Sequence, residues 1–63
     1  MCEANVYLER DGEEELLLEA VYILRPEDGK IYMVNIFGEQ RTVRASFKRL
    51  DLAEERIVLK EGS

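Results

Sequence analysis

This sequence contains no histidine and no tryptophan, and Cys2 is the only cysteine among its 63 residues. Catalysis and tight metal binding in proteins depend largely on imidazole and thiolate groups. Without histidine, neither a Ser–His nor a Cys–His catalytic pair can form. The chain also lacks a glycine-rich phosphate-binding loop and the ligand spacing of a zinc site. We therefore predict that the protein is not an enzyme.

The single cysteine also excludes an internal disulfide. A domain of this length buries only about 60% of the surface that its unfolded chain exposes, so it needs a further source of stability, such as a metal or a second subunit. One thiolate is too few for a closed tetrahedral metal site, which takes its nitrogen or sulfur ligands from several side chains. A second chain would have to supply the rest, so metal binding and self-association are predicted to be one event.

Long hydrophobic runs and an excess of basic residues are absent as well. Apolar stretches such as residues 16–18 and 21–24 are too short to span a bilayer. The net charge of −5 repels nucleic acid and anionic membranes, so we expect neither as a partner. The opening Met-Cys-Glu-Ala has neither the basic nor the apolar part of a secretion signal. Together with a lone thiol, this predicts a cytoplasmic protein.

Alternation of apolar and polar residues, which is typical of half-buried strands, predicts an all-β fold. The predicted strands span residues 2–9, 13–25, 31–37, 41–48 and 56–60. Glutamate and leucine in the second segment favour a helix, but the Asp11-Gly12 hairpin signal before it favours a strand. Further turns are predicted at residues 25–29, at Gly38 and, as one helical turn, at residues 51–54.

These strands predict a single domain, residues 1–63, built as a small five- to six-stranded antiparallel barrel of SH3-like or OB-like size. Residues 16–24 and 31–37 carry apolar side chains on both faces, whereas a sheet with one buried face needs them only at alternate positions. A barrel this small cannot hide both faces. The excess predicts a homodimer interface.

Three interpretations of Cys2 follow from the residues. It can be a small apolar side chain that continues the inward row of Ala4, Val6 and Leu8, and judged on this residue alone we prefer this interpretation. It can be a metal ligand, because its amide nitrogen and Sγ can chelate one ion and the amine of Met1 can close a second ring; such square-planar sites suit Ni(II) or Cu(II). It can also form a disulfide between two chains, which a reducing cytosol disfavours.

The other candidate residues have simpler explanations. Residues 40–50 hold four of the nine basic side chains and no acidic one, and nearby aromatic residues could stack on the bases of an RNA. We prefer ion pairing of these charges with residues 13–15 and other carboxylates, since so few cations on an acidic chain neutralise few phosphates. Residues 13–15 are otherwise expected to form a solvated hairpin tip. Met33 is expected to fill space in the core.

The opening segment, residues 1–8, resembles the N-terminus of the CooT family of small nickel-binding proteins, in which a Met-Cys start leads into an alternating first strand. The resemblance continues through residues 35–39, 50–52 and 56–59 and covers essentially the whole chain. The Met-Cys start is its functionally specific part.

This resemblance implies a cytoplasmic homodimer with a small β-barrel fold that binds Ni(II) at the subunit interface through Cys2, with Met1 following by adjacency. It also implies a role in supplying nickel to an enzyme such as carbon monoxide dehydrogenase. Members of the family have also been labelled as predicted RNA-binding proteins. The favoured function is therefore a nickel-binding accessory protein, and the alternatives are an RNA-binding module or a metal-free protein-interaction barrel in which Cys2 is only structural.

Overall fold

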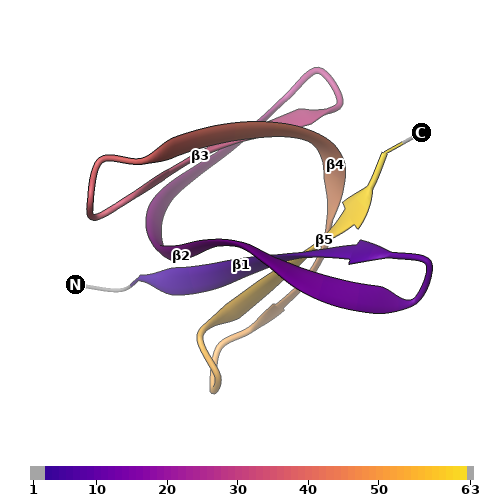
Figure 1. Cartoon of the computed structure of the whole chain (residues 1–63), viewed down its shortest axis with the longest axis horizontal. Helices are drawn as coiled ribbons and strands as arrows, with labels where there is room; N and C mark the ends of the chain where they lie inside the picture. Colours follow the sequence, from indigo (N-terminus) through magenta and orange to yellow (C-terminus); the bar gives the residue numbers. More distant parts are fainter. Residues whose placement is uncertain (1–2, 63) are drawn as a thin grey trace.

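Five strands curl into a closed barrel in the computed structural model, which describes residues 3–62 (Figure 1). The strands are β1 (Ala4–Arg10), β2 (Glu13–Glu27), β3 (Lys30–Asn35), β4 (Gln40–Asp51) and β5 (Arg56–Glu61). The predicted all-β barrel is confirmed, with the smaller of the two expected numbers of strands. Over the described range we find no helix with the length and apolar character needed to cross a membrane.

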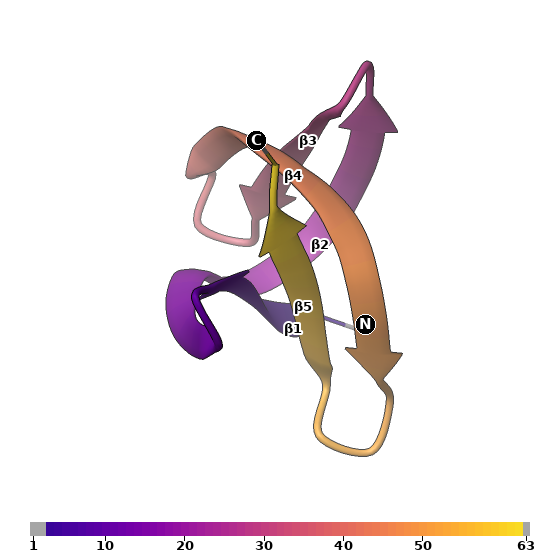
Figure 2. The same ribbon diagram turned by 90° about the vertical axis from the view of Figure 1, so that its right-hand side faces the viewer.

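Each strand pairs with the next in antiparallel fashion, and β1 closes the barrel by pairing with β5 in parallel. Figure 2 shows β1 and β5 running beside each other. The parallel junction follows from the odd number of strands, because strands that alternate in direction leave the first and the last pointing the same way. The antiparallel barrel predicted from the sequence therefore has one parallel seam.

Two Asp-Gly dipeptides form the tight hairpin turns that the sequence predicts. Asp11 and Gly12 have φ values of 53° and 80°, and Asp28 and Gly29 have values of 46° and 75°. Positive φ at both central residues is the conformation that matches the right-handed twist of the flanking strands. These turns fix the register of β1 against β2 and of β2 against β3.

The predicted helical turn at residues 51–54 is wrong. The Glu54 amide does donate to Asp51 Oδ1 at 3.3 Å, as a cap would require, but the segment is a plain turn that leads into β5. Glu55 adopts a φ of 54°, which ends the right-handed turn. The chain then pairs at once with both β4 and β1.

β2 is the longest strand and bends so that its first part pairs with β1 and its second part with β3 (Figure 1). The bend lies at Ala20, whose φ is 58°, and the register shifts close to it on both sides. A bulge of this kind increases the local twist and lets one strand turn a corner of a barrel.

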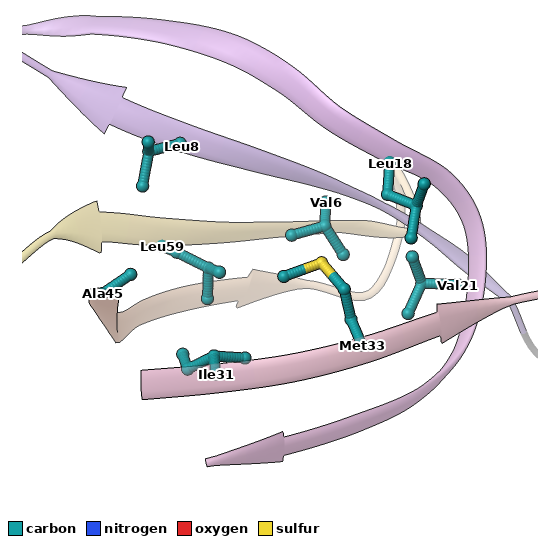
Figure 3. Packing of buried hydrophobic residues seen from close by; sticks show 8 residues of the cluster. All are labelled: Val6, Leu8, Leu18, Val21, Ile31, Met33, Ala45 and Leu59. Carbon is teal, nitrogen blue, oxygen red and sulfur yellow. The ribbon is translucent and has the colours of Figure 1, made fainter. Parts of the chain in front are cut away.

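The core lies inside this ring of strands. Figure 3 shows its buried side chains pointing into the enclosed space, with Met33 extending from β3 toward Val6. The cluster comprises Val6, Leu8, Leu18, Val21, Ile31, Met33, Ala45 and Leu59. Met33 is fully buried, which confirms its predicted role in filling the core.

Replacement of Met33 by alanine is expected to lower the free energy of unfolding by about 2–5 kcal/mol, because it removes buried contacts and leaves a cavity. Urea denaturation followed by circular dichroism measures the change. Leu16→Ala is the matched control, since Leu16 is 51% exposed, and it should change stability by less than about 1 kcal/mol. Equal losses in the two variants would contradict this account of the core.

Candidate functional site

The predicted metal ligands, Met1 and Cys2, lie outside the described residues, which begin at Glu3. The structure therefore defines the surface to which they are attached. Among residues 3–62 we find no gathering of three or more acidic side chains that could hold a metal ion.

An apolar pocket of about 310 Å³ opens where the described chain begins. We refer to it as the N-terminal groove; its lining residues are Glu3, Ala4, Val21, Tyr22, Leu24, Leu50, Leu52, Glu55 and Ile57. Several of its apolar side chains face solvent, with exposed fractions of 50% for Tyr22, 48% for Leu50 and 78% for Leu52. Glu3, the first residue that the structure describes, therefore lies at an exposed apolar surface.

Asn5 fixes the start of β1 between two other segments of the chain. Its backbone amide donates to the Glu55 carbonyl at 3.0 Å, and its side-chain Oδ1 accepts from the Ala20 amide at 3.1 Å. The first contact holds the turn between β4 and β5, and the second satisfies the amide at the bulge of β2. Asn5 therefore holds together three of the segments that line the N-terminal groove, namely β1, β2 and the turn before β5.

Asn35 has a similar structural role at the turn between β3 and β4. It is fully buried; its Oδ1 accepts from the amides of Glu39 at 2.8 Å and Phe37 at 3.1 Å, and its Nδ2 donates to Glu39 Oε1 at 2.7 Å. Sequence reasoning did not identify either asparagine. The available signal for Asn35 was a polar residue at the end of an apolar strand, shortly before Gly38.

Glu14 accepts hydrogen bonds from two arginines, which corrects the expectation that residues 13–15 are only a solvated tip. Arg49 Nη2 lies 2.9 Å from Glu14 Oε2, and Arg56 Nη2 donates to Glu14 Oε1. The Arg56 guanidinium also lies over the Tyr7 ring, 4.1 Å from its centroid. This network joins the start of β2 to the end of β4 and the start of β5.

Two of the four basic residues in residues 40–50 are engaged with carboxylates, as preferred from the sequence. Lys48 forms an ion pair with Glu9, and Arg49 forms one with Glu14. Arg41 donates instead to the Leu17 carbonyl, at 3.4 Å. Two of the four cations considered for RNA binding are therefore neutralised by carboxylates of the same chain.

The ion pair between Glu9 and Lys48 predicts a specific pH dependence of stability. The hydrogen bond from Lys48 lowers the pKa of Glu9 below its ordinary 4.5, against an opposing effect of burial. A carboxyl whose pKa is lowered by folding contributes stability that is complete above its unfolded pKa and is lost as the pH falls through the folded one. Lys48→Met should therefore flatten the loss of stability between about pH 5 and pH 3.

Urea denaturation at several pH values measures this slope. Lys30→Met is the matched control, because Lys30 does not contribute to the lowered pKa of Glu9. The control should keep the slope of the unsubstituted protein. Identical slopes in the two variants would show that Lys48 does not set the pKa of Glu9.

Comparison with known proteins assigns the barrel and its N-terminal segment to one family. The family model for CooT, a CO dehydrogenase accessory protein, matches residues 1–60, a range that includes both Met1 and Cys2. The chain belongs to the CooT family. A crystal structure of a protein provisionally identified as CooT, from Carboxydothermus hydrogenoformans, superposes with a TM-score of 0.90 at 37% identity, covering 98% of this chain and 100% of that one.

A relative in Methanocaldococcus jannaschii, the uncharacterized protein MJ1551, is 30% identical over 59 residues, which is 94% of this chain and 96% of the relative. The CooT assignment rests on the family model and on the solved structure, which both match nearly the whole chain. It confirms the resemblance inferred from the Met-Cys start and places the chain in a family of carbon monoxide dehydrogenase accessory proteins.

Proposed function

We propose that this protein is a nickel-binding accessory protein that acts as a cytoplasmic homodimer and catalyses no reaction itself. Ni(II) is its cargo, held by Cys2 of both protomers with Met1 adjacent, and the dimer supports delivery of nickel to, or maturation of, a nickel enzyme such as carbon monoxide dehydrogenase. Membership of the CooT family, whose description is that of CO dehydrogenase accessory proteins, is the observation that carries this proposal.

The N-terminal groove supports the dimer. Tyr22, Leu50 and Leu52 are about half exposed or more, and contiguous exposed apolar surface commonly marks a protein interface. Two copies that cover each other's grooves about a twofold axis would use the same surface in both subunits. Because Glu3 lines the groove, such a dimer would bring the two Cys2 residues toward one another.

The donor atoms near Cys2 suit nickel. Each chain offers a soft thiolate and a neighbouring amide nitrogen, so two chains offer two sulfur and two nitrogen ligands to one ion. This set favours Ni(II) or Cu(II), of which copper binds such ligands more tightly. Selectivity for nickel would come from availability or from coordination geometry. A reducing cytoplasm would keep the thiols free for binding.

Native mass spectrometry under reducing conditions, with nickel, copper and zinc supplied separately, tests the proposal. We expect a dimer that carries one nickel ion per two chains and a weaker response to zinc, which prefers a tetrahedral site. A monomer that binds no metal, or a dimer whose mass does not change with nickel, would contradict the proposal and favour a protein-interaction barrel in which Cys2 is only structural.

A further inference from the structure

The basic side chains of this acidic protein fall into two groups. Four of the nine form ion pairs with carboxylates: Arg10, Lys48, Arg49 and Arg56. The other five, Arg25, Lys30, Arg41, Arg44 and Lys60, form no ion pair with a carboxylate between residues 3 and 62. Two of these five, Lys30 and Arg44, are both exposed.

Lys30 and Arg44 are also direct cross-strand partners in the pairing of β3 with β4. Like charges at directly opposed positions of an antiparallel pair destabilise the sheet. Their neighbours along the strands, Ile31 and Ala45, are buried, so Lys30 and Arg44 both point to the outside of the barrel. Glu27, the partner of Lys30 on β2, offsets part of this repulsion. Arg44 has no carboxylate opposite it in the pairing of β3 with β4, so an excess of positive charge remains at this pair.

An aromatic residue and a third cation extend this patch. Tyr32 follows Lys30 on the outward side of β3, and Arg25 is its cross-strand partner on β2. The Arg25 guanidinium lies over the Tyr32 ring, 5.4 Å from its centroid. We refer to Arg25, Lys30, Tyr32 and Arg44 as the basic face, on which Glu27 also lies, opposite Lys30. It covers the part of the barrel built by β3 and the strands on either side of it (Figure 1).

We propose that the basic face is a docking surface for an acidic surface of a partner protein. Charge complementarity identifies the occupant: three cations and one carboxylate, Glu27, lie together here, and carboxylates of a partner placed beside Lys30 and Arg44 would neutralise the remaining positive charge. Arginine and tyrosine are also the residues that most often dominate protein interfaces, where they combine apolar area with hydrogen bonding. The proposal does not depend on nickel binding.

Nucleic acid fits this surface less well than protein. Affinity for a phosphate backbone grows with the number of phosphates neutralised, and the basic face offers three cations on a chain of charge −5. Glu27, the cross-strand partner of Lys30 on β2, would in addition repel a continuous phosphate backbone. A protein surface can place separate carboxylates at Lys30 and Arg44 and avoid Glu27.

The test uses the full chain in the presence of a chelator and two fluorescent probes, a peptide of consecutive glutamates and an oligouridylate of the same formal charge. We expect the peptide to bind at low salt, as measured by anisotropy, and to bind more tightly than the oligouridylate. Lys30→Glu and Arg44→Glu should each weaken peptide binding by about tenfold or more. Lys60→Glu is the matched control: it makes the same change in net charge on β5 and should weaken binding far less.

Thermal unfolding supplies a second readout that nonspecific charge effects would not produce. Arg44→Glu converts an opposed like-charge pair into an attractive one, so its melting temperature should rise by about 1–5 °C. Any of four results would overturn the proposal: no binding of the glutamate peptide, equal weakening by Lys60→Glu, binding of the oligouridylate as tight as that of the peptide, or a lower melting temperature for Arg44→Glu.

Discussion

Serine in place of Cys2 is expected to abolish the thiolate-to-nickel charge-transfer absorption of the protein and to weaken nickel binding by more than about 100-fold. The reason is chemical. Serine keeps the size and hydrogen-bonding capacity of the side chain, but its hydroxyl is not deprotonated near neutral pH and its oxygen is a poor match for a soft square-planar ion. The expected loss exceeds the 10- to 100-fold effects typical of residues that only support a ligand.

Nickel titration followed by ultraviolet absorption measures this effect, and the unsubstituted protein should reach its end point at one ion per two chains. Circular dichroism should show the same β-sheet spectrum for both proteins, because Cys2 precedes β1 and the core is built from β1 to β5. Glu3→Gln is the matched control: it changes the residue next to Cys2 and leaves the thiolate in place, so the absorption band should remain.

The charge-transfer band should also disappear as the pH is lowered, because thiolate and amide ligands must lose protons to bind the metal. This loss should occur while the barrel is still folded. Tight nickel binding by Cys2→Ser would exclude the proposed ligand set. A band that persists in acid would exclude a thiolate ligand.

Much of the barrel was predictable from the sequence because its hairpin turns have distinctive chemistry. The two Asp-Gly dipeptides adopt the positive φ values that define such turns, and the strand before Asp11 determines the register of the strand after Gly12. The same turn resolved the ambiguity of residues 13–25, whose glutamates and leucines favour a helix in isolation. Local sequence was sufficient wherever pairing is between neighbours.

Features that depend on side-chain contacts between different strands could not be predicted in this way. Alanine has no intrinsic preference for a positive φ, and Ala20 adopts one at a bulge where its amide donates to Asn5, 15 positions away in the sequence. The ion pair between Glu14 and Arg49 joins residues that are 35 positions apart. Period-two patterns assign a residue to a face of a strand, but they do not show which distant strand lies beside it.

The candidate site was likewise only partly predictable from the sequence. Cys2 could be singled out from composition, since no other residue offers a thiol or an imidazole. The N-terminal groove could not, because its lining comes from β1, β2, β4, β5 and the turn between the last two strands. The sequence predicted excess apolar surface in residues 16–24 and 31–37, whereas the most exposed apolar residue of the groove, Leu52, lies in that turn.

Leu52→Glu is expected to raise the dissociation constant of the proposed homodimer by about 30-fold or more, as for a central interface residue. Leu52 is 78% exposed in the single chain, so a carboxylate there is solvated and should leave the fold intact. In a symmetric dimer built on the N-terminal groove, the substitution would bury two carboxylates without partners, which is strongly unfavourable. Sedimentation velocity over a range of protein concentrations measures the effect.

Leu16→Glu provides the matched control, because Leu16 is 51% exposed but does not line the groove, and its dimer should match that of the unsubstituted protein. Nickel adds a reciprocal test. If two chains together bind one ion more tightly than a single chain does, dimerisation and nickel binding are coupled. Nickel must then strengthen the Leu52→Glu dimer by the same factor by which dimerisation strengthens nickel binding. A dimer unaffected by Leu52→Glu would place the subunit contact elsewhere on the barrel, and the two Cys2 residues would then lack the shared surface that this account gives them.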